Sequence, residues 1–216
     1  MMTPAVLERG RSARKRNAIV DAATELFLEQ GYDGTSMDQV AARAAVSKQT
    51  VYKQFADKER LLGEVVLGLS GTVDAFIDTV GRLLGNPKDL GHALRQLART
   101  YLRTVMQPRV LQLRRLLISQ TARFPELAAT YYERVPERTI TAIADCFRQL
   151  ADAGVLRTPD PFLAARHYAV LVLFIPLDKT LICGESVTYT AAELDSWADA
   201  GVAVFLSAYG SESCSA

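Results

Sequence analysis

This chain of 216 residues has few of the side chains from which catalytic and metal sites are built. It contains only two histidines, His92 and His167, and neither lies near cysteines or paired acids at metal-ligand spacing. The stretch 68–71, Gly-Leu-Ser-Gly, falls short of the G-x-S-x-G nucleophile motif, and there is no glycine-rich phosphate loop. The sequence therefore predicts a protein that is not an enzyme and needs no cofactor and no metal.

Cysteines and long apolar runs are also scarce. Cys146, Cys183 and Cys214 are odd in number and widely spaced, which fits a reducing cytoplasm without a disulfide framework. A redox-sensing role for Cys146 or Cys183 is the alternative to a buried structural thiol. The N-terminus lacks the apolar core of a signal peptide. The most apolar run, residues 168–177, is about half the ~20 residues that span a bilayer. We expect a cytoplasmic protein with no membrane partner.

Positive charge is local. The net charge is only +1, but basic residues crowd the N-terminus: Arg9, Arg11, Arg14, Lys15 and Arg16. Such a run is often only a solvated tail. If a DNA-binding domain follows it, such a run instead favours an arm that follows phosphates or enters the minor groove.

Residues 34–58 read as two short helices joined by a tight turn, followed by the start of a third. Ser36 can cap the first helix, with Gln39 three residues later as a capping box requires. Ser47 can cap the second helix and Asp57 the third. Alanines at 41, 44 and 45 allow the close crossing by which a second helix protrudes into the ~12 Å major groove.

The second helix carries polar side chains where an apolar stripe would otherwise stand. Val51 and Phe55 form its inner face, so residues 48–50, 53 and 54 remain outside. Gln49 and Thr50 can exchange hydrogen bonds with base edges. Lys48 can reach a base or a phosphate, and Tyr52 and Lys53 suit phosphates. The alternative is an ordinary solvated surface helix, which three consecutive caps at this spacing make less favoured.

A longer set of residues matches a known pattern: Ile19, Ala22, Ala23, Phe27, Gly31, Tyr32, Gly34-Thr35-Ser36, Val40-Ala41, Ala45-Val46-Ser47, Thr50-Val51-Tyr52, Phe55, Lys58 and Leu61-Leu62. With these, residues 17–62 resemble the DNA-binding domain of the tetracycline-repressor (TetR) family of bacterial regulators. The glycine common in helix-turn-helix turns is Ala45 here, and alanine is frequent there in this family.

The resemblance implies an all-helical homodimer that represses genes and leaves DNA when a small molecule enters its C-terminal domain. It implies phosphate contacts from Thr35 or Ser36, Tyr52 and Lys58, and base contacts from residues 48–50. Together with the local reading, the predicted DNA-binding residues are Thr35, Ser36, Ser47, Lys48, Gln49, Thr50, Tyr52, Lys53 and Lys58.

The remaining chain is predicted to be helical, without strand alternation or repeats. The expected helices are 58–84, 88–106, 109–122, a segment 125–135, a helix from Pro136 to about residue 153, one capped by Thr158 or Asp160 that reaches Cys183 with a kink at Pro176, and 190–208. Residues 114–118, 124–127, 131–132, 153–156 and 160–161 resemble the AefR-like group within the same family.

The last two predicted helices are unusually apolar. Their apolar residues are Ala164, Tyr168, Leu171, Val172, Ile175 and Leu181 in one and Leu194, Trp197, Ala198, Val202 and Phe205 in the other. Such a pair usually needs a partner surface, and by resemblance it pairs with its copy in a four-helix interface. A monomer that buries the pair internally is the alternative.

A ligand pocket can be argued only from the class of protein. Pockets between bundle helices are mostly apolar with a few polar groups, and the expected lining residues are Tyr101, Gln120, Phe124, Tyr131, His167 and Tyr168. Core packing is the alternative for each. His167 stands out, because a buried neutral imidazole can hydrogen-bond a ligand.

The sequence thus predicts an all-α fold, with a three-helix helix-turn-helix domain at 14–60 and a helical regulatory and dimerisation domain at 61–209. A flexible basic arm, 1–13, precedes them and a tail, 210–216, follows. The expected function is a ligand-responsive repressor that binds a palindromic operator as a homodimer and is released by a small apolar or amphipathic molecule. Two alternatives stay open: a regulator without an inducer pocket, and a helical small-molecule binding protein that does not bind DNA.

Overall fold

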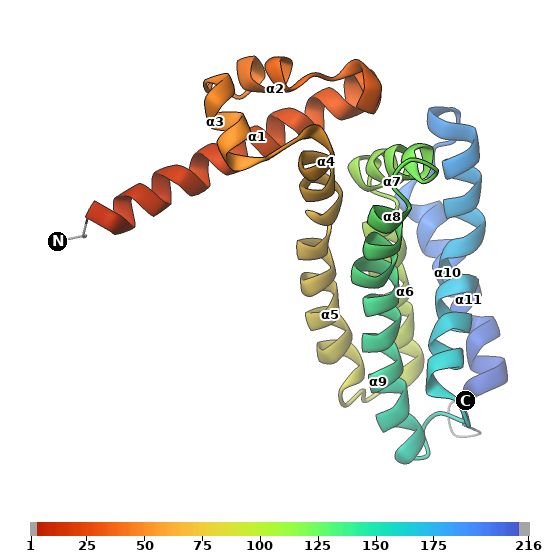
Figure 1. The fold of residues 1–216 in the computed structure, drawn as a ribbon. Helices are drawn as coiled ribbons and strands as arrows, with labels where there is room; N and C mark the ends of the chain where they lie inside the picture. The colour runs from red at the N-terminus through yellow and green to blue at the C-terminus, as the bar shows by residue number, and fades with distance from the viewer. Residues whose placement is uncertain (1–3, 212–216) are drawn as a thin grey trace. The chain divides into compact units, whose positions relative to one another are not determined.

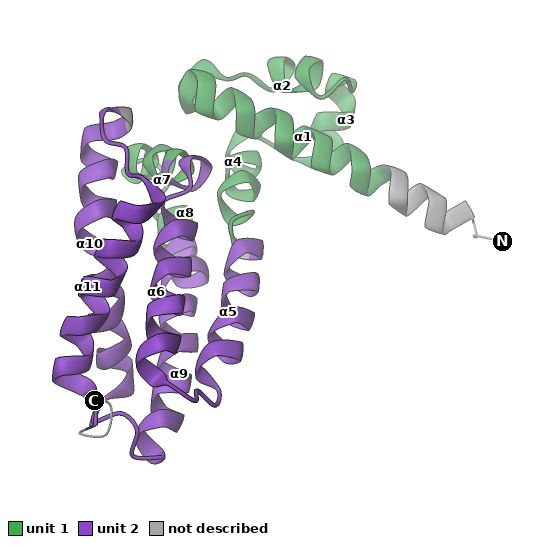
Figure 2. Cartoon of the chain, turned by 180° about the vertical axis from the view of Figure 1, so that it is seen from behind, with its two compact units in different colours: residues 1–69, 112–129 green, residues 70–111, 130–216 purple. Residues whose placement is uncertain are grey.

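The computed structural model describes residues 4–211, without the side chains of residues 4–11, Ser70 and Glu185. Within this range the chain forms helices and no strand (Figure 1). It divides into two compact units (Figure 2). The smaller unit comprises Met1–Leu69 with Gln112–Ala129, and the larger comprises Ser70–Leu111 with Thr130–Ala216. Compared with the predicted domains 14–60 and 61–209, this division also assigns residues 61–69 and 112–129 to the smaller unit.

The N-terminal part of the smaller unit contains α1 (Pro4–Gly34), α2 (Met37–Arg43), α3 (Lys48–Gln54) and α4 (Lys58–Leu67). Residues 4–13 of the predicted flexible arm thus belong to α1. The helices pack around a core that includes Ile19, Ala23, Phe27, Val40, Val51, Phe55, Leu61, Leu62 and Val66. All three predicted caps are confirmed: the side chains of Ser36, Ser47 and Asp57 accept hydrogen bonds from backbone N–H groups in the first turns of α2, α3 and α4.

The single helix predicted over 58–84 is wrong. α4 ends at Leu67, a turn follows at residues 68–69, and α5 (Ser70–Leu84) begins after it. Two glycines and a serine fall within residues 68–71. Glycine weakens a helix interior because it loses more backbone freedom on folding than any other residue, so the helix breaks where such residues cluster.

The larger unit is a bundle of α5, α6 (Leu90–Val105), α9 (Arg138–Asp152), α10 (Pro161–Cys183) and α11 (Ala191–Tyr209). α10 packs against α9 and α11, α11 against α6, and α5 against both α6 and α9. The five helices therefore enclose one core, with Tyr168, Phe147 and Phe205 among its largest fully buried side chains. Helix ends follow the sequence closely: Asp160 caps α10 and Thr190 forms a capping box with Glu193 at α11.

Two further helices, α7 (Pro108–Gln120) and α8 (Pro125–Tyr132), are shared between the units. After α8 the chain passes through a π-helical turn, η1 (Glu133–Glu137), directly into α9. Pro136 lies inside this turn and does not open a new helix, contrary to the prediction. A proline lacks the N–H that a regular helical turn requires, and here it lies in a single π-helical turn, the form in which π-helix mostly occurs within α-helices.

α10 is 23 residues long, and it is the described helix that is long and apolar enough to span a membrane by length and composition alone. The core helix of a soluble protein passes the same test. Ala164, Tyr168, Val172 and Leu173 of α10 are buried in the core, where the helix packs on α9 and α11, and several of its other large apolar side chains lie on an exposed face described below.

Candidate nucleic-acid interface

The turn between α2 and α3 brings the two helices close together. The Val46 N–H donates to the Ala41 carbonyl at 3.0 Å, and the Ala45 N–H donates to the Ala42 carbonyl at 3.2 Å. Ala45 adopts a left-handed conformation with φ of 52°. That region carries little strain for glycine but costs other residues about 1 kcal/mol or more, which explains why helix-turn-helix turns favour glycine at this place.

The outer face of α3 presents the side chains that the sequence predicts for DNA contact. Val51 is fully buried beneath the helix, whereas Lys48, Gln49 and Lys53 are exposed and Tyr52 is 45% exposed. Thr50 is half-buried, and its hydroxyl lies 2.8 Å from that of Ser47 at the start of the helix. The helix therefore carries two lysines, an amide and a phenol outward on a rigidly capped turn.

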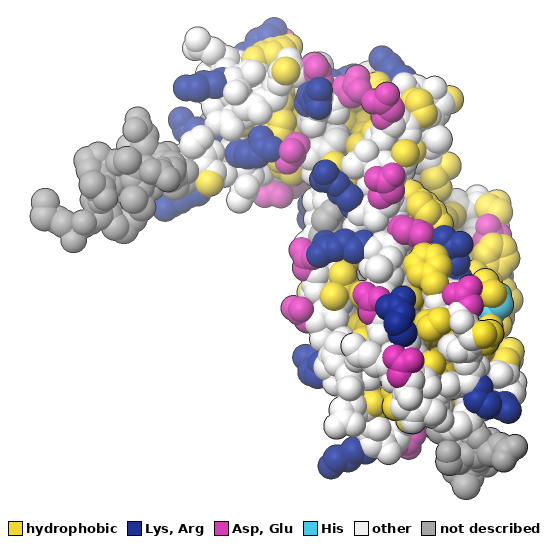
Figure 3. Space-filling model, turned by 60° about the horizontal axis from the view of Figure 1, so that its bottom comes forward, with side chains coloured by type: hydrophobic (Ala, Val, Ile, Leu, Met, Phe, Trp, Pro, Cys, Tyr) yellow, Lys and Arg dark blue, Asp and Glu magenta, His cyan; other side chains and the backbone are white. Residues whose placement is uncertain are grey.

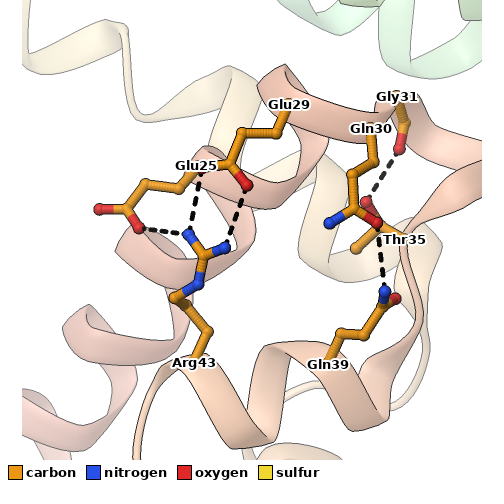
Figure 4. A network of polar contacts seen from close by, with 7 residues as sticks. All are labelled: Glu25, Glu29, Gln30, Gly31, Thr35, Gln39 and Arg43. Atoms are coloured by element: carbon orange, nitrogen blue, oxygen red, sulfur yellow. Dashed lines mark hydrogen bonds and ion pairs between the residues drawn. The ribbon is translucent and has the colours of Figure 1, made fainter.

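A polar network holds α2 against α1 (Figure 4). The Arg43 guanidinium donates to Glu25 at 2.9 Å and to Glu29 at 3.0 Å. Further along the same helix, Gln39 donates to Gln30 at 3.1 Å. The hydrogen bond from Arg43 lowers the pKa of the Glu29 carboxyl. Because these side chains are exposed, the network contributes more to the orientation of α2 than to stability.

Several predicted phosphate ligands have structural partners. Thr35 is only 2% exposed, and its hydroxyl donates to the Gly31 carbonyl at 2.9 Å. Ser36 and Ser47 serve as caps. The Lys58 ammonium donates to the carbonyls of Tyr32 and Thr35, both at 2.8 Å, and lies 4.3 Å from the centre of the Tyr32 ring. The sequence motif gave no sign of this last role, and phosphate contact from these residues stays a prediction.

The segment 112–129 contributes a second set of contacts to the smaller unit. Arg123 forms an ion pair with Asp33 at 2.8 Å, and its guanidinium lies 5.1 Å from the Tyr32 ring centre. Phe124 meets the same ring edge-on at 5.2 Å between centres. Phe124, predicted to line a pocket, thus packs against the end of α1.

The other predicted pocket residues divide between the two units. Gln120 is half-buried in the smaller unit. In the larger unit, Tyr101 is buried with its ring 4.7 Å from that of Phe76, and Tyr131 is also buried. Tyr168 is fully buried and donates to the Leu94 carbonyl at 2.8 Å. Burial raises the pKa of its hydroxyl well above the usual value.

The expectation of a buried imidazole at residue 167 is wrong. His167 is exposed, and its Nδ1 lies 2.6 Å from the Tyr209 hydroxyl. The cause is the register of α10, which turns the adjacent Tyr168 into the core and leaves its neighbour outside. Cys183 is exposed and Cys146 is half-buried, whereas Cys214 lies outside the described residues. Burial raises the pKa of the Cys146 thiol, which makes it less reactive.

Among the described residues, no three His, Cys, Asp or Glu side chains gather as metal ligands do. The larger unit instead exposes hydrophobic side chains, which Figure 3 shows in yellow among charged ones. On α10 and α11 the large ones are Leu163, Val170, Leu171, Phe174, Ile175, Ile182, Trp197 and Val204, and we call this set the apolar face.

Two family models match the chain. The model of bacterial regulatory proteins of the tetR family matches residues 19–65, and that of the AefR-like transcriptional repressor C-terminal domain matches residues 92–211. The chain belongs to the TetR family. TetR-family proteins are DNA-binding transcriptional regulators that act as dimers, and α2 and α3 lie within residues 19–65, which match the tetR-family model.

Solved structures of bacterial regulators resemble this chain over 93% of its length. A transcriptional regulator from Mesorhizobium loti is 44% identical, with a TM-score of 0.87 over 93% of this chain and 99% of that one. The flavonoid-responsive regulator FrrA is 34% identical, with a TM-score of 0.71 over the same shares. The curated regulator YdeS of Bacillus subtilis is 33% identical over 89 residues, or 41% of this chain. The chain spans only 39% of the length of YdeS.

Proposed function

We propose that this protein is a cytoplasmic repressor that binds a palindromic operator as a homodimer and leaves it when a small apolar or amphipathic molecule binds. The observation that carries the DNA-binding part is the outer face of α3, where exposed Lys48, Gln49 and Lys53 stand on a helix fixed by its cap and by buried Val51. The C-terminal match to a repressor domain supports the negative sign of regulation.

Within α3, Gln49 and Thr50 are the proposed base readers, because side chains of their length fit base edges in the major groove. Selection from random duplexes should yield one palindromic site. Replacing either residue by alanine should weaken binding to that site by roughly 1–3 kcal/mol and binding to random DNA much less. Lys53→Ala, which removes a proposed phosphate contact, should weaken both alike. Equal losses on both duplexes for Gln49→Ala would refute its role as a base reader.

The homodimer is proposed to form through the apolar face. Six large apolar side chains of α10 and two of α11 are between 37% and 75% exposed. Exposed apolar patches of this kind mark protein interfaces. A two-fold dimer would present two copies of α3 to a palindromic operator, whose half-sites lie about 34–36 Å apart, one turn of DNA.

Response to a small molecule is supported by one relative: FrrA, 34% identical over nearly the whole chain, is described as flavonoid-responsive. A panel of flavonoids screened for release from the selected operator is therefore the first experiment. By linkage, a compound that weakens operator binding must itself bind more weakly to the operator complex, by the same factor. Calorimetry with and without operator measures both. Equal affinity of the compound in both titrations would contradict induction and leave the DNA-binding assignment intact.

A further inference from the structure

An ion pair joins the first turn of α2 to the first residue of α3. The Lys48 Nζ atom lies 2.8 Å from Oδ1 and 3.0 Å from Oδ2 of Asp38, so both carboxylate oxygens face one ammonium. The two side chains are 60% and 63% exposed. The Tyr52 ring centre lies 6.0 Å from the same nitrogen. Lys48 therefore stands at the edge of the proposed DNA-reading face with its position set by a residue of the other helix.

The backbone positions of both Asp38 and Lys48 are held by contacts within the smaller unit. Ser36 and Ser47 cap the two helices, only two and one residues before Asp38 and Lys48 respectively. The Arg43 network holds the opposite end of α2 on α1. A lysine side chain is otherwise a flexible point charge with several rotatable bonds. Here its ammonium is held on a frame that does not need DNA to form.

The chemistry of the ammonium then differs from that of an unpaired lysine. It has three N–H donors, and two carboxylate oxygens leave at least one donor for another acceptor. Without the carboxylate, a lysine at a DNA surface binds any nearby phosphate, and such contacts carry no sequence information. With it, the positive charge is compensated, and a nearby phosphate is repelled by Asp38. A hydrogen bond from the ammonium to a neutral acceptor, such as guanine O6 or N7, remains favourable.

We propose that Asp38 is a specificity-determining residue that positions Lys48 to contact a base edge and keeps it from binding phosphates indiscriminately. This rests on the proposed function, since it requires that α3 enters the major groove. Stability alone gives little reason for the pair, because exposed ion pairs contribute little to folding. Asp38 acts through Lys48 and is a positioning residue, whereas Lys48 makes the contact.

The test compares Asp38→Asn with the wild-type chain on the selected operator and on a random duplex of equal length, over a series of salt concentrations. Freed Lys48 should strengthen binding to random DNA. The salt dependence of that binding should steepen by about 0.9 in log K against log salt for each added phosphate contact. The operator-to-random affinity ratio should fall roughly 5-fold or more, the loss expected for one discriminating contact. An unchanged operator-to-random ratio, which means equal changes in both affinities, would overturn the proposal.

A matched control removes the same charge elsewhere. Asp145 forms an ion pair with Arg148 at 2.7 Å with side chains 57% and 56% exposed, in α9 of the larger unit. Asp145→Asn should leave the affinity ratio unchanged, so a fall in this variant would mean that net charge alone explains the result. Circular dichroism establishes whether each variant is folded.

Lys48→Met separates positioning from direct contact. This variant alone should lower the operator-to-random ratio, and adding Asp38→Asn to it should change the ratio no further. A further fall in the double variant would mean that Asp38 touches DNA itself, which overturns the positioning role. If Asp38→Asn does not fold, Lys48→Met decides alone: equal losses on both duplexes would make Lys48 a phosphate ligand and overturn the proposal. A wild-type chain that prefers no duplex would refute the proposed function instead.

Discussion

At the scale of single residues, the ammonium of Lys58 ties together the end of α1 and the start of α4. It donates to two backbone carbonyls, those of Tyr32 and Thr35, and lies over the Tyr32 ring. The carbonyls at a helix end have no partner within the helix, and a cation there also favours the helix dipole. Lys58 is thus a C-terminal capping residue for α1, 23 residues away from Thr35 in sequence.

Lys58→Met should therefore destabilise the smaller unit. The substitution keeps a chain of similar length and removes the donor, so two part-buried carbonyls lose a charged partner at a cost of about 1–3 kcal/mol. Urea unfolding, followed by circular dichroism, measures the change. Lys53→Met, on the exposed face of α3, is the control and should change stability by less than about 0.5 kcal/mol. Equal stability of both variants would show that the Lys58 hydrogen bonds are dispensable.

Residue-scale features differ in how far the sequence reveals them. The caps at Ser36, Ser47 and Asp57 were predictable, because a cap and its N–H partner lie within three residues. The partners of Lys58 were not, because they lie 23 and 26 residues away in sequence. The same holds for Phe124, whose partner Tyr32 lies 92 residues away and meets it only after folding. The exposed position of His167 was likewise not predictable, because it depends on the rotation of α10, which places Tyr168 in the core and His167 outside.

At the scale of elements, α10 and α11 approach each other closely at Gly201. A Cβ atom there would lie 2.6 Å from the carbonyl oxygen and 2.9 Å from the carbonyl carbon of Leu171. Cβ atoms in proteins essentially never lie so close to other heavy atoms. Because the opposing atoms belong to the backbone, the clash cannot be relieved by a side-chain movement. Glycine at 201 therefore sets the distance between the two helices that carry the apolar face.

Gly201→Ala should destabilise the larger unit by about 1–3 kcal/mol, the usual cost of overpacking. Gly81→Ala is the matched control, since Gly81 is exposed within α5 and a Cβ there would meet nothing within 4 Å. Alanine should stabilise that helix by about 0.5–1 kcal/mol, because it loses less backbone freedom on folding. Chemical unfolding of the two variants should give changes of opposite sign. Two changes of the same sign would contradict this account of Gly201.

α6 and α11 are joined by a ladder of ion pairs. Arg99 Nε donates to Asp199 Oδ1 at 2.9 Å, and one helical turn further Arg103 pairs with Asp195. The hydrogen bond from Arg99 lowers the pKa of the Asp199 carboxyl below its usual value of 3.8, although partial burial opposes the shift. A carboxyl with a lowered pKa stabilises the folded state above its unfolded pKa, and this contribution disappears as the pH falls through the folded pKa.

Asp199→Asn should therefore lower stability at pH 7, and its difference from the wild-type chain should shrink as the pH falls below about 4. Thermal unfolding of both proteins between pH 7 and pH 3 provides the comparison. A stability difference that stays constant over this range would mean that the packing of residue 199 causes it and that the ion pair contributes nothing.

At the scale of the whole molecule, the sequence predicted the order of the helices, most of their ends and the apolar character of the last two. It did not predict which of the apolar side chains of α10 and α11 are buried in the core and which are exposed. Ala164, Tyr168 and Val172 point into the larger unit's core, whereas Leu171, Ile175 and Trp197 are exposed. The division follows from helix rotation, which packing against α9 and α6 decides. The membership of residues 112–129 in the smaller unit is a tertiary outcome of the same kind.

The apolar face yields a prediction for the whole assembly. Phe174 is 57% exposed at this face, so Phe174→Glu should leave the fold intact but place a charge where a second copy must dock, at a high desolvation cost. Sedimentation should show a monomer. Operator affinity should fall at least about 100-fold. In a dimer, binding of one α3 helix to its half-site raises the effective concentration of the second α3 helix at the other half-site, and a monomer loses this gain. Ile118→Glu, at an equally exposed apolar position in the smaller unit (59%), should remain a dimer. A Phe174→Glu protein that still sediments as a dimer would move the interface away from α10 and α11.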